Sequence, residues 1–212
     1  MAFSFNGTNQ RLTPPLPPAT ISPLTIVCWF NASNNTTTGA LITLTNSANS
    51  TNYFTIYASG AVVGDPVQLL TQGTGGNQIV STTAGYASNS WSHACAVFES
   101  NTSRTVFLNG ANSALGSVPI SPQGINEFNI GSFKVTAGNW FSGLIAEVGI
   151  WNAALTAAEI ASLAKGMTCD KVRPQSLVFY APLVRDLIDQ KGGFAITNNN
   201  GATVANHPRI YP

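Results

Sequence analysis

Charged residues are rare in this sequence. Lys and Arg total 9 and Asp and Glu total 8, so charged residues make up 8% of the chain and the formal net charge is +1. Hydrophobic residues reach 44%, which excludes a disordered chain, because disorder requires low hydrophobicity with high charge. The sequence has no basic patch, so we expect no nucleic-acid partner. A neutral surface rich in amides and hydroxyls favours contacts made by shape and hydrogen bonds, as with sugars or obligate protein neighbours.

Cysteine and long apolar runs are also scarce. The 3 cysteines show no metal-binding spacing. Cys28 and Cys95 fall in strand-like runs and are expected to be buried free thiols, although a Cys28–Cys95 disulfide stays open. No run approaches the roughly 18 apolar residues of a membrane span, and the first residues carry no signal-peptide pattern. We therefore expect no membrane partner and no export by the usual route.

Short segments of alternating hydrophobicity recur between Gly, Asn and Pro clusters, which is typical of β-strands. Asn109-Gly110 after an apolar run predicts a tight hairpin. Residues 26–30 and 94–98 are apolar at every position, so we expect both faces of those strands to be covered. The expected strands are residues 3–6, 24–30, 40–45, 53–58, 67–71, 78–82, 91–98, 104–108, 127–130, 144–151 and 176–183.

One helix is expected, at residues 157–165. Thr156 and Glu159 have the spacing of a capping box, and Gly166 follows as a stop signal. Many short strands with one helix predict an all-β protein, a two-sheet antiparallel β-sandwich of the jelly-roll type. Nearly half of the charges lie after Gly166, so we place a soft boundary there. Residues 1–166 would form the sandwich, and residues 167–212 an extension with a strand and an extended tail, packed on the sandwich or on a neighbour.

Several of these segments, taken in order, resemble a known family. They resemble the laminin-G-like and pentraxin-like branch of the concanavalin A-like lectin/glucanase superfamily over about residues 2–165. That resemblance implies a jelly roll but no single function, because the fold hosts lectins, adhesion modules, enzymes and virion proteins. The whole chain is also similar in style to accessory virion proteins of tailed bacteriophages. The segments are Phe5-Asn6-Gly7, LTIVCW at 24–29, WSHA at 91–94, RTVFLNG at 104–110, Ile130-Gly131 and FSGLIAEVGIWNAALT at 141–156.

No catalytic constellation is evident. Glucanases of this fold place two carboxylates on one strand face, about 5 Å apart in retaining enzymes, which requires a spacing of two or four residues. No two acids in this chain have that spacing. His93 lies within a strand and is expected to be a core-edge residue bonded to backbone, and His207 lies in a proline-flanked tail as a solvated or packing residue. We therefore expect a protein that is not an enzyme.

A metal site is expected to be weak or absent. Calcium prefers six to eight oxygen ligands, several of them carboxylates. The resemblance implies acids near the first Phe and beside Glu147, but this chain has Asn6 and Ala146 there. We therefore expect no cofactor, with Glu147 and Asn6 as the nearest candidates for a doubtful calcium site.

Aromatic residues in loops are the candidates for sugar binding. Trp140, Tyr86 and Tyr53 each lie beside Gly or Asn residues and could provide exposed platforms. The other tryptophans, Trp29, Trp91 and Trp151, fall in strands and are expected in the core.

Two functional hypotheses follow, and both are non-enzymatic. The first is a bacteriophage virion component, located in the virion as a head decoration or tail-associated protein, with capsid or tail partners and self-association. The alternative is a glycan-binding lectin or adhesion module that recognises extracellular or cell-surface carbohydrate. A glycoside hydrolase is the least favoured hypothesis.

Overall fold

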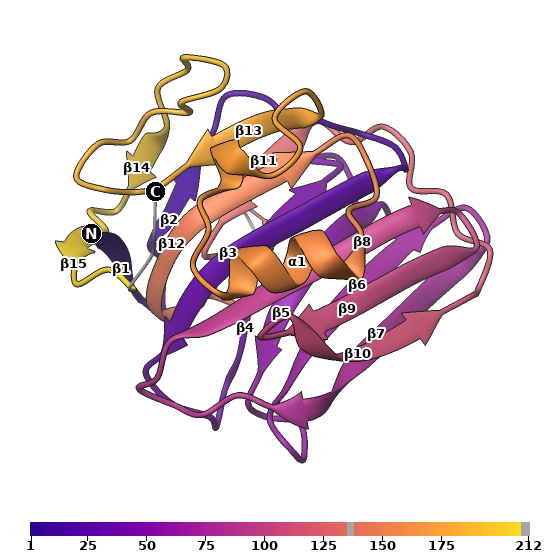
Figure 1. Cartoon of the computed structure of the whole chain (residues 1–212), viewed down its shortest axis with the longest axis horizontal. Helices are drawn as coiled ribbons and strands as arrows, with labels where there is room; N and C mark the ends of the chain where they lie inside the picture. The colour runs from indigo at the N-terminus through magenta and orange to yellow at the C-terminus, as the bar shows by residue number, and fades with distance from the viewer. Residues whose placement is uncertain (135–137, 209–212) are drawn as a thin grey trace.

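The computed structural model describes residues 1–134 and 138–208 (Figure 1). Two antiparallel sheets pack face to face, as the sequence predicted, so the jelly-roll sandwich is confirmed. One sheet has the order β10-β9-β8-β3-β12-β1-β15, with β13 also paired to β12. Its strands are β1 (Ala2–Asn6), β3 (Leu24–Ala32), β8 (Ser92–Ser100), β9 (Ser103–Leu108), β10 (Ala111–Gly116), β12 (Ser142–Trp151), β13 (Leu177–Ala181) and β15 (Thr203–Ala205).

The second sheet has seven strands in the order β14-β2-β11-β4-β5-β6-β7. They are β2 (Arg11–Thr13), β4 (Thr38–Thr45), β5 (Tyr53–Ser59), β6 (Pro66–Gly73), β7 (Gly76–Gly85), β11 (Glu127–Ile130) and β14 (Thr197–Asn199). The segment after Gly166 contributes to both sheets, because β13 and β15 join the first sheet and β14 joins the second. It therefore packs on the sandwich as part of the same two layers. The last part of the predicted tail, residues 209–212, lies outside the described residues.

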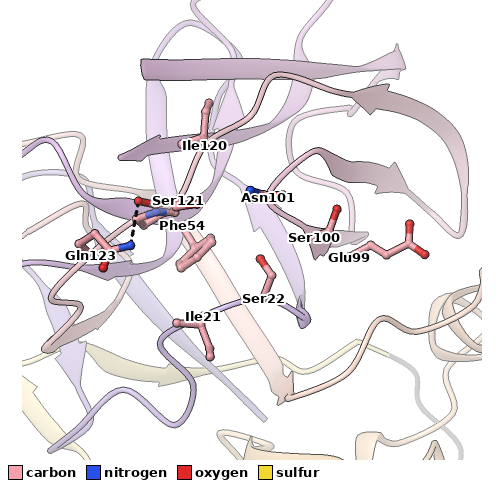
Figure 2. A pocket seen from close by; sticks show the side chains of 10 residues that line it. Ile21, Ser22, Phe54, Glu99, Ser100, Asn101, Ile120, Ser121 and Gln123 are labelled. Atoms are coloured by element: carbon pink, nitrogen blue, oxygen red, sulfur yellow. Dashed lines mark hydrogen bonds between the residues drawn. The ribbon is translucent and has the colours of Figure 1, made fainter. Parts of the chain in front are cut away.

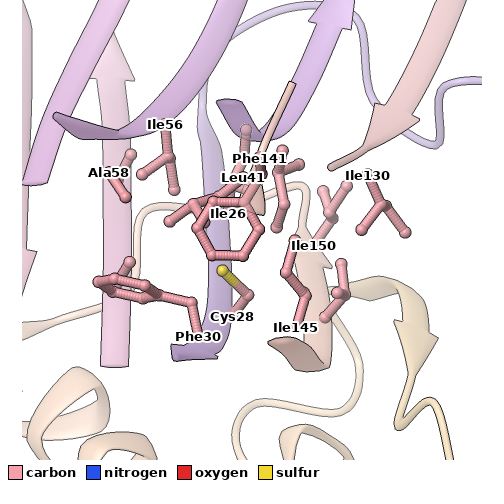
Figure 3. Close-up of a cluster of buried hydrophobic side chains, with 14 of the residues drawn as sticks. Ile26, Cys28, Phe30, Leu41, Ile56, Ala58, Ile130, Phe141, Ile145 and Ile150 are labelled. Atoms are coloured by element: carbon pink, nitrogen blue, oxygen red, sulfur yellow. The ribbon is translucent and has the colours of Figure 1, made fainter. Parts of the chain in front are cut away.

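The core fills the space between the sheets. Figure 3 shows Cys28 of β3 between Ile26 and Phe30, facing Leu41 and Ile56 of the opposite sheet. Elsewhere in the core, the Phe54 and Phe98 rings pack edge to face with their centroids 4.9 Å apart. Alternate residues of each strand point inward, as a period of two requires.

The strands β3 and β8 are covered on both faces, as expected. Cys28 belongs to the core between the sheets, whereas Val27 and Cys95 belong to a second apolar cluster on the outer face. Cys28 pairs with Ala94, one position from Cys95, so the two thiols point to opposite faces. All three cysteines are free and buried, so the open question of a Cys28–Cys95 disulfide is answered in the negative.

The second cluster is covered by the helix α1 (Ala157–Ala164) and by the 3₁₀ turn η1 (Cys169–Lys171). Figure 1 shows α1 lying across the outer face of the first sheet. The capping box is present: Thr156 Oγ1 accepts from the Glu159 N–H at 3.4 Å, and Glu159 Oε2 accepts from the Thr156 N–H at 2.8 Å. Gly166 has φ +99°, the left-handed stop expected after the helix. Ile160 and Leu163 are buried against the sheet.

The hairpin at Asn109-Gly110 is also confirmed. Both residues have positive φ, +54° and +73°, and Leu108 pairs with Ala111 across the turn. Its second strand, β10, was not predicted, because Ala-Asn-Ser-Ala-Leu-Gly lacks the β-branched and aromatic residues that mark strands. The hairpin register, rather than residue propensity, places β10 beside β9.

Candidate functional site

A pocket of about 320 Å³ opens at one end of the sandwich (Figure 2). Four segments meet there: the connection from β2 to β3, the start of β5, the β8–β9 turn and the connection from β10 to β11. Hereafter this is the end pocket. Its lining residues are Ile21, Ser22, Phe54, Glu99, Ser100, Asn101, Ile120, Ser121, Pro122 and Gln123.

Backbone contacts hold the walls of the end pocket together. Ser121 and Thr74 exchange two backbone hydrogen bonds of 2.9 and 3.0 Å, which ties the β10–β11 connection to the β6–β7 hairpin. The Ile120 N–H donates to the Asn101 carbonyl at 2.8 Å, joining that connection to the β8–β9 turn. The Gln123 N–H donates to Asn52 Oδ1 at 2.8 Å. The pocket is thus formed by loops that are fixed to the sheets.

Arg104 supports both walls from beneath. Its side chain is only 2% exposed, and Nη1 donates to Gln78 Oε1 at 2.6 Å and to the Val118 carbonyl at 2.8 Å. Nη2 donates to the Asn101 carbonyl at 2.5 Å. Burial lowers the pKa of this guanidinium. Because a buried cation is costly without strong acceptors, these three oxygens fix the positions of the turn and the connection that form the pocket.

The chemistry of the end pocket is mixed. Phe54 is buried and provides an apolar floor, and Ile21, 68% exposed, lies at the edge of the pocket with its side chain directed away from Phe54 (Figure 2). Asn101 and Gln123 are exposed amides, and the Gln123 Nε2 donates to the Ser121 carbonyl at 3.3 Å (Figure 2). Both side chains keep an oxygen that can accept hydrogen bonds. Glu99 lies at the rim with its carboxylate directed away from Phe54 (Figure 2), where Oε2 accepts from Ser103 Oγ at 2.8 Å. An apolar floor with polar groups at the edge is typical of a small-ligand pocket.

Of the predicted sugar-binding aromatics, only Trp140 keeps an accessible ring. Trp140 is half-buried, outside the end pocket, with the Arg11 guanidinium carbon 5.8 Å from its ring centroid. The expected exposure of Tyr53 and Tyr86 is wrong. Tyr53 is covered by the Phe133 ring at 5.0 Å, and Tyr86 packs against Phe30 at 5.2 Å in the core.

The buried tyrosines are consistent with a structural role. Burial raises the pKa of Tyr86 to about 12 and also raises that of Tyr53. Of the strand tryptophans, Trp151 is fully buried as predicted, while Trp29 and Trp91 are half-buried.

The two metal candidates do not form one site. Asn6 Oδ1 accepts from the N–H groups of Thr8, Asn9 and Gln10 at 2.9 to 3.3 Å, so it closes a turn. Asn6 pairs with Ser142, five residues before Glu147 on β12, which places the two roughly 15 Å apart along the strand. Among residues 1–134 and 138–208, no group of three or more His, Cys, Asp or Glu side chains is placed to hold a metal ion.

Glu147 is instead a buried structural acid. Its Oε2 accepts from the Tyr180 hydroxyl at 2.6 Å, and Oε1 lies 3.0 Å from His207 Nε2. The contact between Oε1 and Nε2 does not have the geometry of a hydrogen bond. Glu147 is thus held between Tyr180 and His207, away from Asn6.

His93 is buried but not bonded as expected. Its Nδ1 has no hydrogen-bond partner in the described part of the chain, and its ring packs edge-on against Trp29 at 5.5 Å. Burial lowers the pKa of His93 to about 3, so the imidazole is neutral at physiological pH. Its ring contact and its burial give it no route to a substrate.

Sequence reasoning missed the end pocket. Its residues come from turns that contain no motif, and the Arg104 that fixes them was assigned only to a strand. The available signals were two polar loops, Glu-Ser-Asn-Thr at 99–102 and Ser-Pro-Gln-Gly at 121–124. Loops carried on a rigid sandwich are frequent binding sites, but nothing in the sequence shows that these two meet.

The paired sheets, the capped helix and the loop-lined pocket define a lectin-like β-sandwich. The chain belongs to the concanavalin A-like lectin/glucanases superfamily, whose laminin-G-type model matches residues 6–161. No curated protein matches the sequence closely. In the structure, no helix among the described residues has the length and apolar character needed to cross a membrane.

Three solved structures show how widely this fold is used. A native heptameric SAP-like pentraxin from Limulus polyphemus has a TM-score of 0.69 at 18% identity and covers 97% of this chain and 94% of its own. Domain 4 of AbnA, an extracellular arabinanase from Geobacillus stearothermophilus in complex with arabinotriose, has a TM-score of 0.65 at 19% identity, covering 77% and 76%. A Ruminococcus gnavus sialidase module bound to sialyllactose has a TM-score of 0.61 at 14% identity, covering 77% and 98%. At these identities the similarity shows the fold alone.

Proposed function

We propose that this protein is a non-enzymatic carbohydrate-binding module that holds a glycan in the end pocket. The observation that carries the proposal is that the amides Asn101 and Gln123 line one pocket together with the apolar side chains of Phe54 and Ile21. Sugars present hydroxyls at their edges and C–H groups on their faces, so amides and an apolar surface complement them together. Two of the similar structures contain a bound oligosaccharide, which supports the same ligand class.

A binding role is favoured over hydrolysis by the acids of the pocket. Glu99 is the one carboxylate among the described residues that line it, and its carboxylate points away from the floor. Glycosidases need a pair of carboxyl groups about 5 to 9 Å apart. The arrangement supports binding, in which a single rim acid needs no partner.

The setting we propose is extracellular or at a cell surface. The arabinanase domain comes from an extracellular enzyme, and the pentraxin is a heptamer. Self-association, expected from the sequence, is part of this proposal. The virion hypothesis draws no support from the structures named above and stays a prediction from the sequence.

The proposal is tested by glycan-array screening followed by calorimetry with pocket variants. Asn101→Ala removes an exposed amide whose side chain has no hydrogen-bond partner among the described residues, so the fold should be unaffected. We expect about 3- to 10-fold weaker binding, the effect of one hydrogen bond. Asn152→Ala is the matched control, an exposed amide beyond the end of β12 and outside the pocket.

Two results would contradict the proposal. One is an array without any bound glycan, and the other is equal affinity for the wild type, Asn101→Ala and Asn152→Ala. Release of reducing ends from a bound glycan would show hydrolysis and overturn the non-enzymatic part.

A further inference from the structure

Arg11 is a cation without a hydrogen-bond or ion-pair partner among residues 1–134 and 138–208. It lies on β2, where its buried neighbour Leu12 points into the core, so Arg11 points to the outer face of the seven-stranded sheet. Its guanidinium forms no hydrogen bond or ion pair with any described residue, and its Nε is buried and unpaired. A buried N–H without a partner is rare in native structures and requires an explanation.

The other buried or half-buried arginines show what is missing. Arg104 has three oxygen acceptors, and Arg173 is paired with Glu159 through two nitrogen–oxygen contacts of 2.9 and 2.5 Å. For Arg11, the described residues supply no such oxygen acceptor, and the Trp140 ring lies beside it with its centroid 5.8 Å from the guanidinium carbon. A cation–π contact fixes the plane of a guanidinium but leaves its N–H groups unsatisfied.

Two further side chains meet at the same place. Asn199 on β14 is directly opposite Arg11 in the register and lies on the same face, about 5 Å away at Cβ. Its Nδ2 donates to Thr13 Oγ1 at 3.0 Å and to the Thr197 carbonyl at 3.4 Å, which leaves Oδ1 able to accept a hydrogen bond from a ligand. The indole N–H of Trp140 is a further donor that has no hydrogen-bond partner in the described ranges.

This set of groups selects an anionic ligand. A guanidinium donates two parallel hydrogen bonds to a carboxylate, a geometry that a hydroxyl cannot match. The indole N–H and the amide oxygen are suited to ring hydroxyls beside that carboxylate. The face is also half-open, since Arg11, Trp140 and Asn199 are all partly exposed.

We propose that Arg11, Trp140 and Asn199 form a second glycan site, which binds a carboxylate-bearing sugar such as a uronic acid. The inference rests on the proposed function only in taking carbohydrate as the ligand class. The site lies on the outer sheet face and shares no residue with the end pocket.

The test is a titration of isotope-labelled protein with glucuronate, with glucose as the neutral control, followed at the indole N–H of Trp140. We expect a saturable shift with glucuronate and an affinity at least about 10-fold higher than for glucose, as a charge-assisted hydrogen bond implies. Arg11→Gln should abolish the preference. Arg11→Lys keeps the charge without the fork, so it should recover only part of it.

Lys165→Gln is the control for general charge. It removes one exposed cation after α1 and should leave glucuronate binding unchanged. The inference is overturned if glucuronate causes no saturable shift, if glucose binds equally well, or if Lys165→Gln weakens binding as much as Arg11→Gln. Thermal midpoints of all three variants show whether a loss is due to unfolding.

The two proposals fail separately. If the end pocket does not bind glycans, Asn101→Ala will leave the affinity for neutral glycans unchanged, whatever the result for the Arg11 variants. Loss of the second site appears as an absent glucuronate preference while Asn101→Ala still weakens neutral glycan binding.

Discussion

Acid should destabilise this protein through His93, and the size of the effect can be calculated. The imidazole is fully buried, so its pKa is lowered to about 3 in the folded protein, whereas an unfolded chain gives about 6.5. Between these two pH values the unfolded state holds one proton more than the folded state at this position. The free energy of unfolding therefore falls as pH falls through this window, by about 1.4 kcal/mol per pH unit.

From pH 6.5, where the unfolded imidazole is already half protonated, to pH 4.5, the loss from His93 alone is about 2 kcal/mol. That is a large part of the free energy of unfolding of a typical domain, which is about 5 to 15 kcal/mol. Urea unfolding at both pH values measures the loss in the wild type. Other groups also titrate in this range, so the same pair of measurements on His93→Gln supplies the subtraction.

We expect the wild type to lose about 2 to 3 kcal/mol more than His93→Gln over this interval. The imidazole resonances of the folded wild type should also stay those of the neutral ring down to about pH 4. Equal losses in the two proteins, or a folded imidazole that titrates near pH 6.5, would show that burial of neutral His93 does not cause the acid destabilisation.

Three further predictions concern the scaffold. Gly75→Ala should destabilise the protein by at least about 2 kcal/mol in urea unfolding. Gly75 has φ +101°, and an added Cβ would lie 2.1 Å from the Pro119 carbonyl oxygen. The control Gly138→Ala, whose Cβ would meet no described atom within 4 Å, should leave the free energy of unfolding unchanged. Thr156→Ala removes the capping-box bond to Glu159 and should cost about 1 kcal/mol in the same assay; no change would mean that α1 does not need its cap. The cysteines should titrate as 3 free thiols in denaturant and be unreactive in the native protein, since all are buried; fewer than 3 would indicate a disulfide.

The fold could be predicted because its signals are local. The capping box at Thr156, the Asn109-Gly110 turn and the alternating strands each depend on near neighbours in the sequence. The two-face apolar runs of β3 and β8 also predicted that something would cover the outer face, and α1 does. Of the first sheet's strands, the two at its edges, β10 and β15, were missed. The residues of β10 have weak strand preference, and β15 has only 3 residues.

The candidate site could not be predicted, because it depends on contacts between distant segments. The segments that carry Asn101 and Gln123 are joined by the hydrogen bond from the Ile120 N–H to the Asn101 carbonyl, and no residue pattern in the sequence predicts that contact. The exposure of Tyr53 was predicted wrongly for the same reason. Phe133, eighty residues later in the chain, covers its ring.

The Arg11 site was half visible in the sequence. Trp140 was predicted as a loop aromatic, but Arg11 lies 129 residues before it and Asn199 lies 59 residues after it in the sequence. They meet only because β14, from the C-terminal extension, pairs with β2 at the edge of the second sheet. A partner that arrives from the other end of the chain cannot be found from local periodicity.

The proposed carbohydrate-binding function requires that a glycan occupies the end pocket. Its most direct test is to map backbone amide shifts of labelled protein as a glycan found by array is added. We expect the largest shifts to cluster at Ser22, Ser100, Asn101 and Gln123. Their half-saturation should need about 3- to 10-fold more glycan in Asn101→Ala and the wild-type concentration in Asn152→Ala. Shifts that cluster on another surface, or that are unchanged in Asn101→Ala, would contradict it.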